Sequence, residues 1–191
     1  MDTSIPVAVS ARHVHLSQAT IQALFGPEHV LQVKCMLSQP GQFAAVETVS
    51  LVGPRGQLDH VRVLGPPRDA DQVEVSRSDE ITLGIDAPLR VSGDLRQTPG
   101  IELVGPAGRV HIDHGVVMPV RHIHMSPDDA GRLGVRDGQR VRVAVDSDGR
   151  DLVFADVAVR VSPKFRLELH LDTDEGNAAG ASHGATAKLL L

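Results

Sequence analysis

The stretch Arg12-His13-Val14-His15-Leu16-Ser17 returns later in the chain as Arg121-His122-Ile123-His124-Met125-Ser126, and this repeat organises the whole sequence. Each copy ends in a serine that is followed by a short helical pattern, over residues 18–25 in the first copy and 127–133 in the second. Both serines suit the N-cap position of a helix, and Gly26 and Gly134 suit the positions where the helices stop. The recurrence predicts two halves that share one strand–turn–helix unit.

Outside the repeat, the pattern is that of short β-strands separated by Gly and Pro clusters. The predicted strands cover residues 48–52, 59–64, 72–75, 89–91, 101–104, 109–112, 140–145, 152–161 and 167–171. Many short strands with few helices favour barrels or sandwiches. We therefore predict a mainly β fold of two small β-barrel domains with short capping helices, related by the internal repeat. The first domain covers residues 1–100, the second covers residues 101–191, and each holds one Arg-His-x-His motif.

Composition excludes several classes of protein. The 191 residues carry 19 Lys and Arg against 24 Asp and Glu, a formal net charge of −5, which argues against a general binder of nucleic acid or of membrane surfaces. The single Cys35 excludes an internal disulfide framework, and no apolar run reaches the roughly 20 residues of a membrane-spanning helix. We expect a cytoplasmic protein with no nucleic-acid or membrane partner, for which self-association into a homo-oligomer stays open.

The paired histidines suit metal binding. Residues i and i+2 of a strand point to the same face, so His13 with His15, and His122 with His124, can each aim two imidazoles at one point. Zinc accepts imidazole nitrogens, and three protein ligands with an open position are typical of a catalytic site. Further ligands must come from elsewhere, and the candidates are His170 and Glu74, each in a β-like run. Arg68 could hold an anion beside the metal by two parallel hydrogen bonds.

Other interpretations of the same residues stay open at this point. A His-x-His pair on a strand can be a polar stripe that faces solvent, and Glu74 can be an ordinary surface carboxylate. The four repeated histidines could also close around a single structural zinc ion without Glu74 or His170. The recurrence of both pairs in one sequence context favours metal binding over surface decoration. The chain has no serine elbow, Walker loop or dinucleotide fingerprint that would indicate another chemistry.

Several blocks of this sequence resemble the PduL-type phosphotransacylases, also called phosphate propanoyltransferases. The resemblance rests on residues 9–17, 37–44, 65–68, 121–126 and 170–177, which occur in the order of the family and span nearly the whole chain. Members of that family interconvert acyl-CoA plus phosphate with acyl phosphate plus coenzyme A. The resemblance thus implies a phosphate acyltransferase with a two-zinc site between two β-barrels.

The resemblance also implies roles for individual residues, at the positions of this chain that match the motifs of the family. The resemblance implies that His13, His15 and Glu74 bind a first zinc, whose fourth position accepts the sulfur of coenzyme A. It implies that His122, His124 and His170 bind a second zinc, on which phosphate replaces water, and that Arg68 binds phosphate. The residues implied at the coenzyme A surface are Ser10, Arg62, Leu64 and Asn177.

The chain departs from the family pattern at Ala11, where Asn is usual, and at Cys35, where Lys is common. Members housed in bacterial microcompartments carry an amphipathic N-terminal extension, and we expect none here because only a short stretch precedes Arg12. Two other functions remain as alternatives: a metal-dependent hydrolase of acyl phosphates or thioesters, and a β-barrel interaction module held together by structural zinc. Metal content and the dependence of the reaction on phosphate would separate these three.

Overall fold

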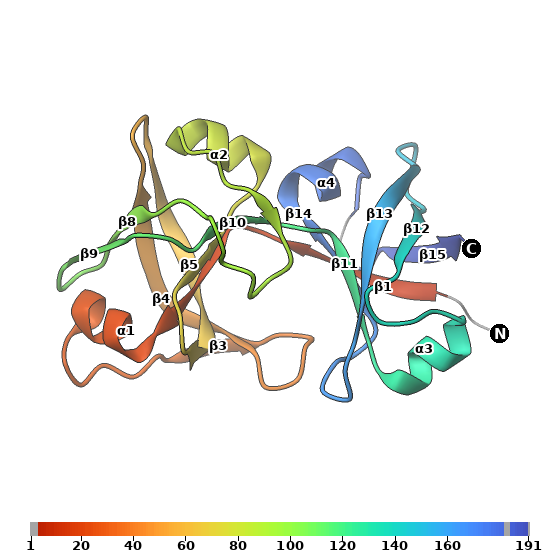
Figure 1. The fold of residues 1–191 in the computed structure, drawn as a ribbon, viewed down its shortest axis with the longest axis horizontal. Helices are drawn as coiled ribbons and strands as arrows, with labels where there is room; N and C mark the ends of the chain where they lie inside the picture. Colours follow the sequence, from red (N-terminus) through yellow and green to blue (C-terminus); the bar gives the residue numbers. More distant parts are fainter. Residues whose placement is uncertain (1–3, 182–183, 191) are drawn as a thin grey trace. The chain divides into compact units, whose positions relative to one another are not determined.

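The computed structural model describes residues 4–181 and 184–190 (Figure 1). The chain divides into two compact units. The barrel unit consists of Met1–Ala11 together with Val120–Leu191, and the open-sheet unit consists of Arg12–Pro119. Both are built mainly of short strands, and no helix within the described ranges is long and apolar enough to cross a membrane. The predicted mainly β fold with short helices is confirmed.

In the barrel unit, six strands of the described residues close into a barrel. Their order around the barrel is β1 (Ser4–Ser10), β14 (Glu168–Asp172), β11 (His122–Met125), β13 (Leu152–Val161), β12 (Arg140–Val145) and β15 (Thr186–Leu190). Alternate side chains face the interior, so Ile5, Ile123, Val159 and Leu169 are buried in one apolar core. Helix α3 (Pro127–Leu133) follows β11, and α4 (Thr173–Ala178) follows β14.

The open-sheet unit is a curled half-barrel, with nine strands in the described part of the chain. The order is β7 (Leu89–Arg90), β10 (Val116–Pro119), β6 (Gln72–Glu74), β2 (His13–Ser17), β5 (Gln57–Arg68), β4 (Phe43–Val52), β8 (Ile101–Val104) and β9 (Arg109–Ile112), with β3 (Val33–Met36) paired to β4. Its core includes Val14, Val63, Val73 and Leu103. Two helices, α1 (Gln18–Phe25) and α2 (Arg77–Leu83), complete the unit.

The two units are not consecutive halves of the chain, and this division differs from the predicted one at residue 100. The first strand, β1, pairs with β14 and β15 near the C-terminus, so it belongs to the barrel unit although it opens the chain. In the same way β10 pairs with β6 and β7 of the open-sheet unit, and that unit therefore extends to Pro119. Pairing between distant strands, which local patterns do not reveal, sets both boundaries.

Strand pairing confirms that the two units share one internal repeat. Strand β2 lies between β5, which is parallel to it, and β6, which is antiparallel. Strand β11 lies in the same way between a parallel β13 and an antiparallel β14. The strand preceding each motif is also equivalent, because β1 runs parallel to β14 and β10 runs parallel to β6. Each Arg-His-x-His motif is therefore surrounded by the same set of strands.

Capping side chains fix where the helices begin. The predicted N-caps are confirmed: Ser17 accepts a hydrogen bond from the backbone N–H of Thr20, and Ser126 accepts one from Asp129. Two further helices, α2 and α4, were not predicted. Both begin with a capping box, in which Ser76 pairs with Asp79 and Asp172 pairs with Glu175, and this spacing of three residues is the signal that could have revealed them.

Candidate metal centre

The first histidine pair lies on one face of the sheet in the open-sheet unit. His13 and His15 alternate along β2 with Val14, whose side chain is fully buried in the core, so the two imidazoles share the opposite face. Their ring centroids are 5.1 Å apart and their planes are nearly perpendicular. Both residues are buried, with exposed fractions of 8% and 4%. The geometry expected from the His-x-His spacing is therefore present.

Glu74 completes this group from the neighbouring strand. It is the antiparallel register partner of His13, and its Oε2 lies 3.4 Å from His13 Nε2. The other carboxylate oxygen, Oε1, accepts hydrogen bonds from Gln72 Nε2 at 2.5 Å and from the Ser92 hydroxyl at 3.0 Å. These two donors hold Oε1 and leave Oε2 directed at the histidine. We call His13, His15 and Glu74 the first trio; their possible ligand atoms all lie within 4.8 Å of one another.

The second histidine pair lies on the barrel unit at the equivalent place. His122 and His124 flank the buried Ile123 on β11, and His170 on β14 is the antiparallel register partner of His122. The imidazoles of His122 and His170 are stacked with centroids 4.9 Å apart, and His124 Nδ1 lies 3.2 Å from His170 Nε2. These three residues form the second trio, in which the possible ligand atoms also lie within 4.8 Å of one another.

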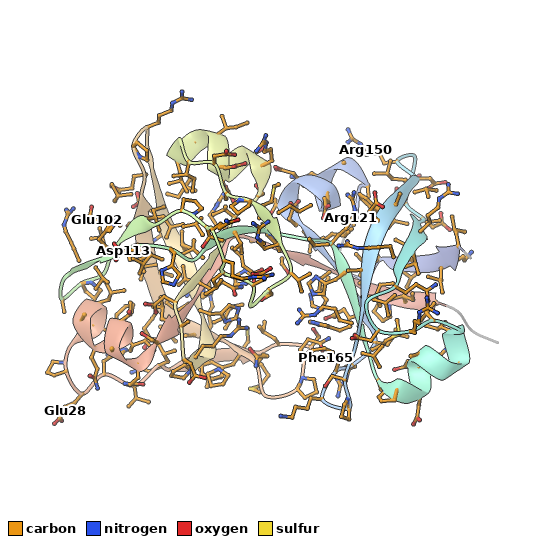
Figure 2. All side chains as sticks on the ribbon, in the orientation of Figure 1. Glu28, Glu102, Asp113, Arg121, Arg150 and Phe165 are labelled. Carbon is orange, nitrogen blue, oxygen red and sulfur yellow. The ribbon has the colours of Figure 1, made fainter. Side chains whose placement is uncertain are left out.

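Neighbouring groups orient the rings of the second trio. His122 Nδ1 lies 2.8 Å from the carbonyl oxygen of Val120. Because a carbonyl only accepts, Nδ1 carries the proton and the lone pair of the neutral ring is on Nε2. The ring of Phe165, labelled in Figure 2, packs on His124 with a centroid separation of 4.0 Å. The backbone and an aromatic ring therefore fix two of the three imidazoles.

Burial keeps one imidazole of each trio neutral. Burial, together with the neighbouring His13 and Arg68, lowers the pKa of His15 well below its ordinary value of 6.5. Burial, together with His122, His170 and Arg160, lowers the pKa of His124 to about 2. Neutral imidazole is the form that binds a metal ion, so near neutral pH these two rings need lose no proton to act as ligands.

Both trios fit a zinc ion by the chemistry and spacing of their donors. Two ligands of a tetrahedral zinc ion, each about 2.0–2.1 Å from the metal, lie about 3.3 Å apart. The contacts of 3.4 Å in the first trio and 3.2 Å in the second match that separation. His15 Nδ1 is also buried without a hydrogen-bond partner, which is costly for a polar atom. Two nitrogens with a carboxylate, and three nitrogens, are both sets that zinc accepts.

The remaining predicted residues divide between the two units. Arg68 ends β5 as the register partner of Ser17, and its charge acts on His15 in the first trio. Arg62 and Leu64 are the β5 partners of His13 and His15, and Arg62 donates to the carbonyl oxygens of Ala45 and Val46 at 3.0 and 2.7 Å. In the barrel unit, Ser10 is the register partner of Asp172, which caps α4, and Asn177 is exposed on that helix.

The motif arginines have a role that the sequence analysis missed. Arg12 donates from Nε to Asp79 Oδ1 at 2.7 Å, and Asp79 is the capping-box residue of α2. Arg121, labelled in Figure 2, donates to Glu175 at 2.8 Å, and Glu175 is the capping-box residue of α4. These helices directly follow the strands that carry Glu74 and His170. Each motif arginine therefore binds the helix that follows the strand carrying the third donor.

The chain is similar to known proteins over nearly its whole length. The family described as phosphate propanoyltransferase matches residues 6–182. The phosphate propanoyltransferase of Salmonella typhimurium is 56% identical over 179 residues, covering 94% of this chain and 85% of that protein. Those of Escherichia fergusonii and Shewanella putrefaciens are 54% and 51% identical over 187 and 189 residues, each covering 98% of this chain and 89% of the relative.

Proposed function

Because this chain belongs to the phosphate propanoyltransferase family and is a phosphate acyltransferase, we propose that it transfers a short acyl group reversibly between coenzyme A and phosphate with two zinc ions, one in each trio. In the forward direction the bond between acyl carbon and sulfur breaks and a bond to a phosphate oxygen forms. The products are acyl phosphate and coenzyme A. The observation that supports two centres is that each His-x-His pair finds its third donor within its own unit, at equivalent places in the repeat.

When bound, zinc supplies positive charge that stabilises a thiolate and the anionic oxygens of phosphate. The chain itself supplies neutral and oriented ligands. His15 and His124 offer lone pairs at neutral pH, the Val120 carbonyl fixes the tautomer of His122, and Gln72 holds Glu74 with Oε2 toward His13. Because each trio provides three protein donors, a tetrahedral ion there keeps a position for substrate.

Arg68 is the residue that we assign to phosphate. Its charge acts on His15, so the guanidinium belongs to the surroundings of the first trio. Guanidinium binds phosphate oxygens by paired hydrogen bonds and stays charged at any pH that the protein experiences. Held this way, phosphate would meet the acyl carbon in a fixed orientation, which lowers the entropic part of the barrier. No side chain of the protein then needs to act as a nucleophile.

For coenzyme A we propose contacts in each unit: with Ser10 and Asn177 in the barrel unit, and with Arg62 and Leu64 in the open-sheet unit. Leu64 is half-buried beside His15 in the register of β5 and β2, so an acyl or pantetheine group there would meet an apolar side chain next to the first trio. Exposed Asn177 offers an amide for hydrogen bonds to polar parts of the cofactor.

An assay of coenzyme A release tests the proposed function. Purified protein is given acetyl-, propanoyl- or butanoyl-CoA, with and without inorganic phosphate, and free thiol and acyl phosphate are both measured. We expect thiol release that requires phosphate, matches acyl phosphate formed one to one, and stops when a chelator removes the metal. Thiol release at the same rate without phosphate would show a hydrolase instead. A zinc-loaded protein inactive with all three substrates would contradict the proposal.

A further inference from the structure

A fourth polar group lies beside the second trio. Glu168 precedes His170 by two residues on β14, so both side chains lie on the same face of the barrel wall. Its Oε2 lies 3.1 Å from His170 Nε2, and it is the register partner of His124 on β11. Glu168 is buried, with 8% of its surface exposed. Neither the residue patterns nor the resemblance to relatives assigned it a role.

The internal repeat identifies the counterpart of Glu168 in the open-sheet unit. His170 corresponds to Glu74, because each is the antiparallel partner of the first histidine of its motif. The residue two places earlier is therefore Glu168 in the barrel unit and Gln72 in the open-sheet unit. In the open-sheet unit the glutamate, Glu74, is the register partner of the first histidine of the motif, whereas in the barrel unit the glutamate, Glu168, is the register partner of the second histidine. Each centre therefore has one carboxylate on the strand that is antiparallel to its motif.

The positions of the two glutamates matter for the net charge of each metal centre. A zinc ion in the first trio meets two neutral imidazoles and the carboxylate of Glu74, which reduces the net charge of that centre from +2 to +1. The three imidazoles of the second trio supply no negative charge, and Arg160, the register partner of His124, adds a cation nearby. A divalent cation in a half-buried position is costly unless an anion offsets it. Glu168 is the carboxylate in place to do so from beside the trio, with its Oε2 3.1 Å from His170 Nε2.

We propose that Glu168 provides the negative charge of the second metal centre and is required for its zinc affinity, as Glu74 is for the first. The inference rests on the proposed function, since it assumes that the second trio binds zinc. Glu168 is assigned here to metal binding and carries no part of the acyl transfer itself.

The test is the zinc affinity of Glu168→Gln, measured by competition with a chromophoric chelator. The variant is made in wild-type protein and in a His13→Ala background, where only the second centre should remain. We expect Glu168→Gln to weaken one of the two zinc sites by about 10- to 100-fold, the range typical for groups that support metal ligands. It should leave the other site unchanged. Glu102→Gln, which removes a half-buried carboxylate on a strand of the open-sheet unit, should leave both affinities unchanged.

One further variant and one further readout keep the outcome clear. Glu168→Asp retains the charge and should keep more affinity than Glu168→Gln, whereas a purely structural role would make the shorter side chain the worse of the two. Melting of the metal-free proteins shows whether Glu168→Gln is folded. Wild-type protein with fewer than two zinc ions per chain would refute the proposed function. Wild-type protein with two ions, and Glu168→Gln with unchanged affinity, would refute the role of Glu168 alone.

Discussion

At the scale of single residues, the positions of the donors were predictable and the groups that orient them were not. Two-residue alternation along a strand was enough to place His13 and His15 on one face, and the structure has them there. Glu74 and His170 were candidates from their β-like runs alone, but assigning each to its histidine pair required the resemblance, because register between strands brings them in. Gln72 and Glu168 lie two residues before those donors, but only the folded sheet shows that they face them.

Arg68→Ala tests the assignment of phosphate binding. Loss of paired, charge-assisted hydrogen bonds worth about 1.5–3 kcal/mol predicts a decrease of about 10- to 100-fold in kcat/KM for phosphate. Zinc content should not change, because Arg68 is not a donor of either trio. Steady-state kinetics with varied phosphate, together with metal analysis, measure both quantities. Arg109→Ala, on an exposed ion pair of the same unit, is the control, and equal phosphate kinetics in both variants would remove Arg68 from the mechanism.

The lowered pKa of His124 predicts how acid affects the metal-free protein. In the folded state its pKa is about 2, whereas in the unfolded chain it returns to about 6.5, so between these values the unfolded state binds more protons. The free energy of unfolding therefore falls as the pH falls from 7 to 5, and His124 accounts for about 1–2 kcal/mol of that loss. Urea unfolding at both pH values should show a smaller loss for His124→Asn. Equal losses for the two proteins would contradict the assignment.

At the scale of elements, the repeated strand–turn–helix unit was predicted well because its signals are local. Both helices that follow the motifs begin and end at the expected residues, since their caps lie within a few residues of the helix. Helices α2 and α4 are short, and an acidic stretch such as residues 172–177 does not show helical periodicity over so few residues. Strand β10 was also missed, because it is recognised by its pairing with β6 and β7 rather than by its own sequence.

The arginine of each motif should stabilise the unit that holds its trio. Arg12 binds the capping-box acid of α2, Asp79, and Arg121 binds that of α4, Glu175. Asp79 is buried, with a side-chain exposure of 5%. Arg12→Gln should therefore lower the free energy of unfolding by about 1–2 kcal/mol. This value is smaller than that of a fully buried ion pair, because Arg12 is 40% exposed and water screens its charge. Denaturant unfolding measures this value. Arg109→Gln, from an exposed pair, should change it by less than about 0.5 kcal/mol, and an Arg12→Gln effect as small as this would show that the contact is incidental.

At the scale of the whole molecule, each motif follows a strand that pairs in the other unit. Strand β1 pairs in the barrel unit and leads into β2 of the open-sheet unit, while β10 pairs in the open-sheet unit and leads into β11 of the barrel unit. The predicted division of the chain into two consecutive domains was based on the order of the two motifs along the sequence. The exchange of β1 and β10 between the units depends on pairing with strands far away in the sequence, so no local sequence pattern could predict it.

Fragments test this exchange. Residues 12–119 contain every strand of the open-sheet unit and should fold alone, whereas residues 1–100 keep β1 without β14 and β15 and lack β8, β9 and β10. We expect cooperative thermal unfolding and dispersed amide signals in nuclear magnetic resonance spectra for residues 12–119 only. Cooperative unfolding of residues 1–100 would show that the exchanged strands are dispensable.

The most direct test of the central claim is the number of zinc ions per chain in matched variants. Each trio is complete within its own unit, so the account predicts two ions in the wild-type protein, one in His13→Ala, one in His122→Ala and none in the double variant. Plasma mass spectrometry after dialysis against zinc gives these counts. One ion in the wild-type protein that either single substitution abolishes would mean that the four motif histidines share a closed structural site, and the two-centre account would be wrong.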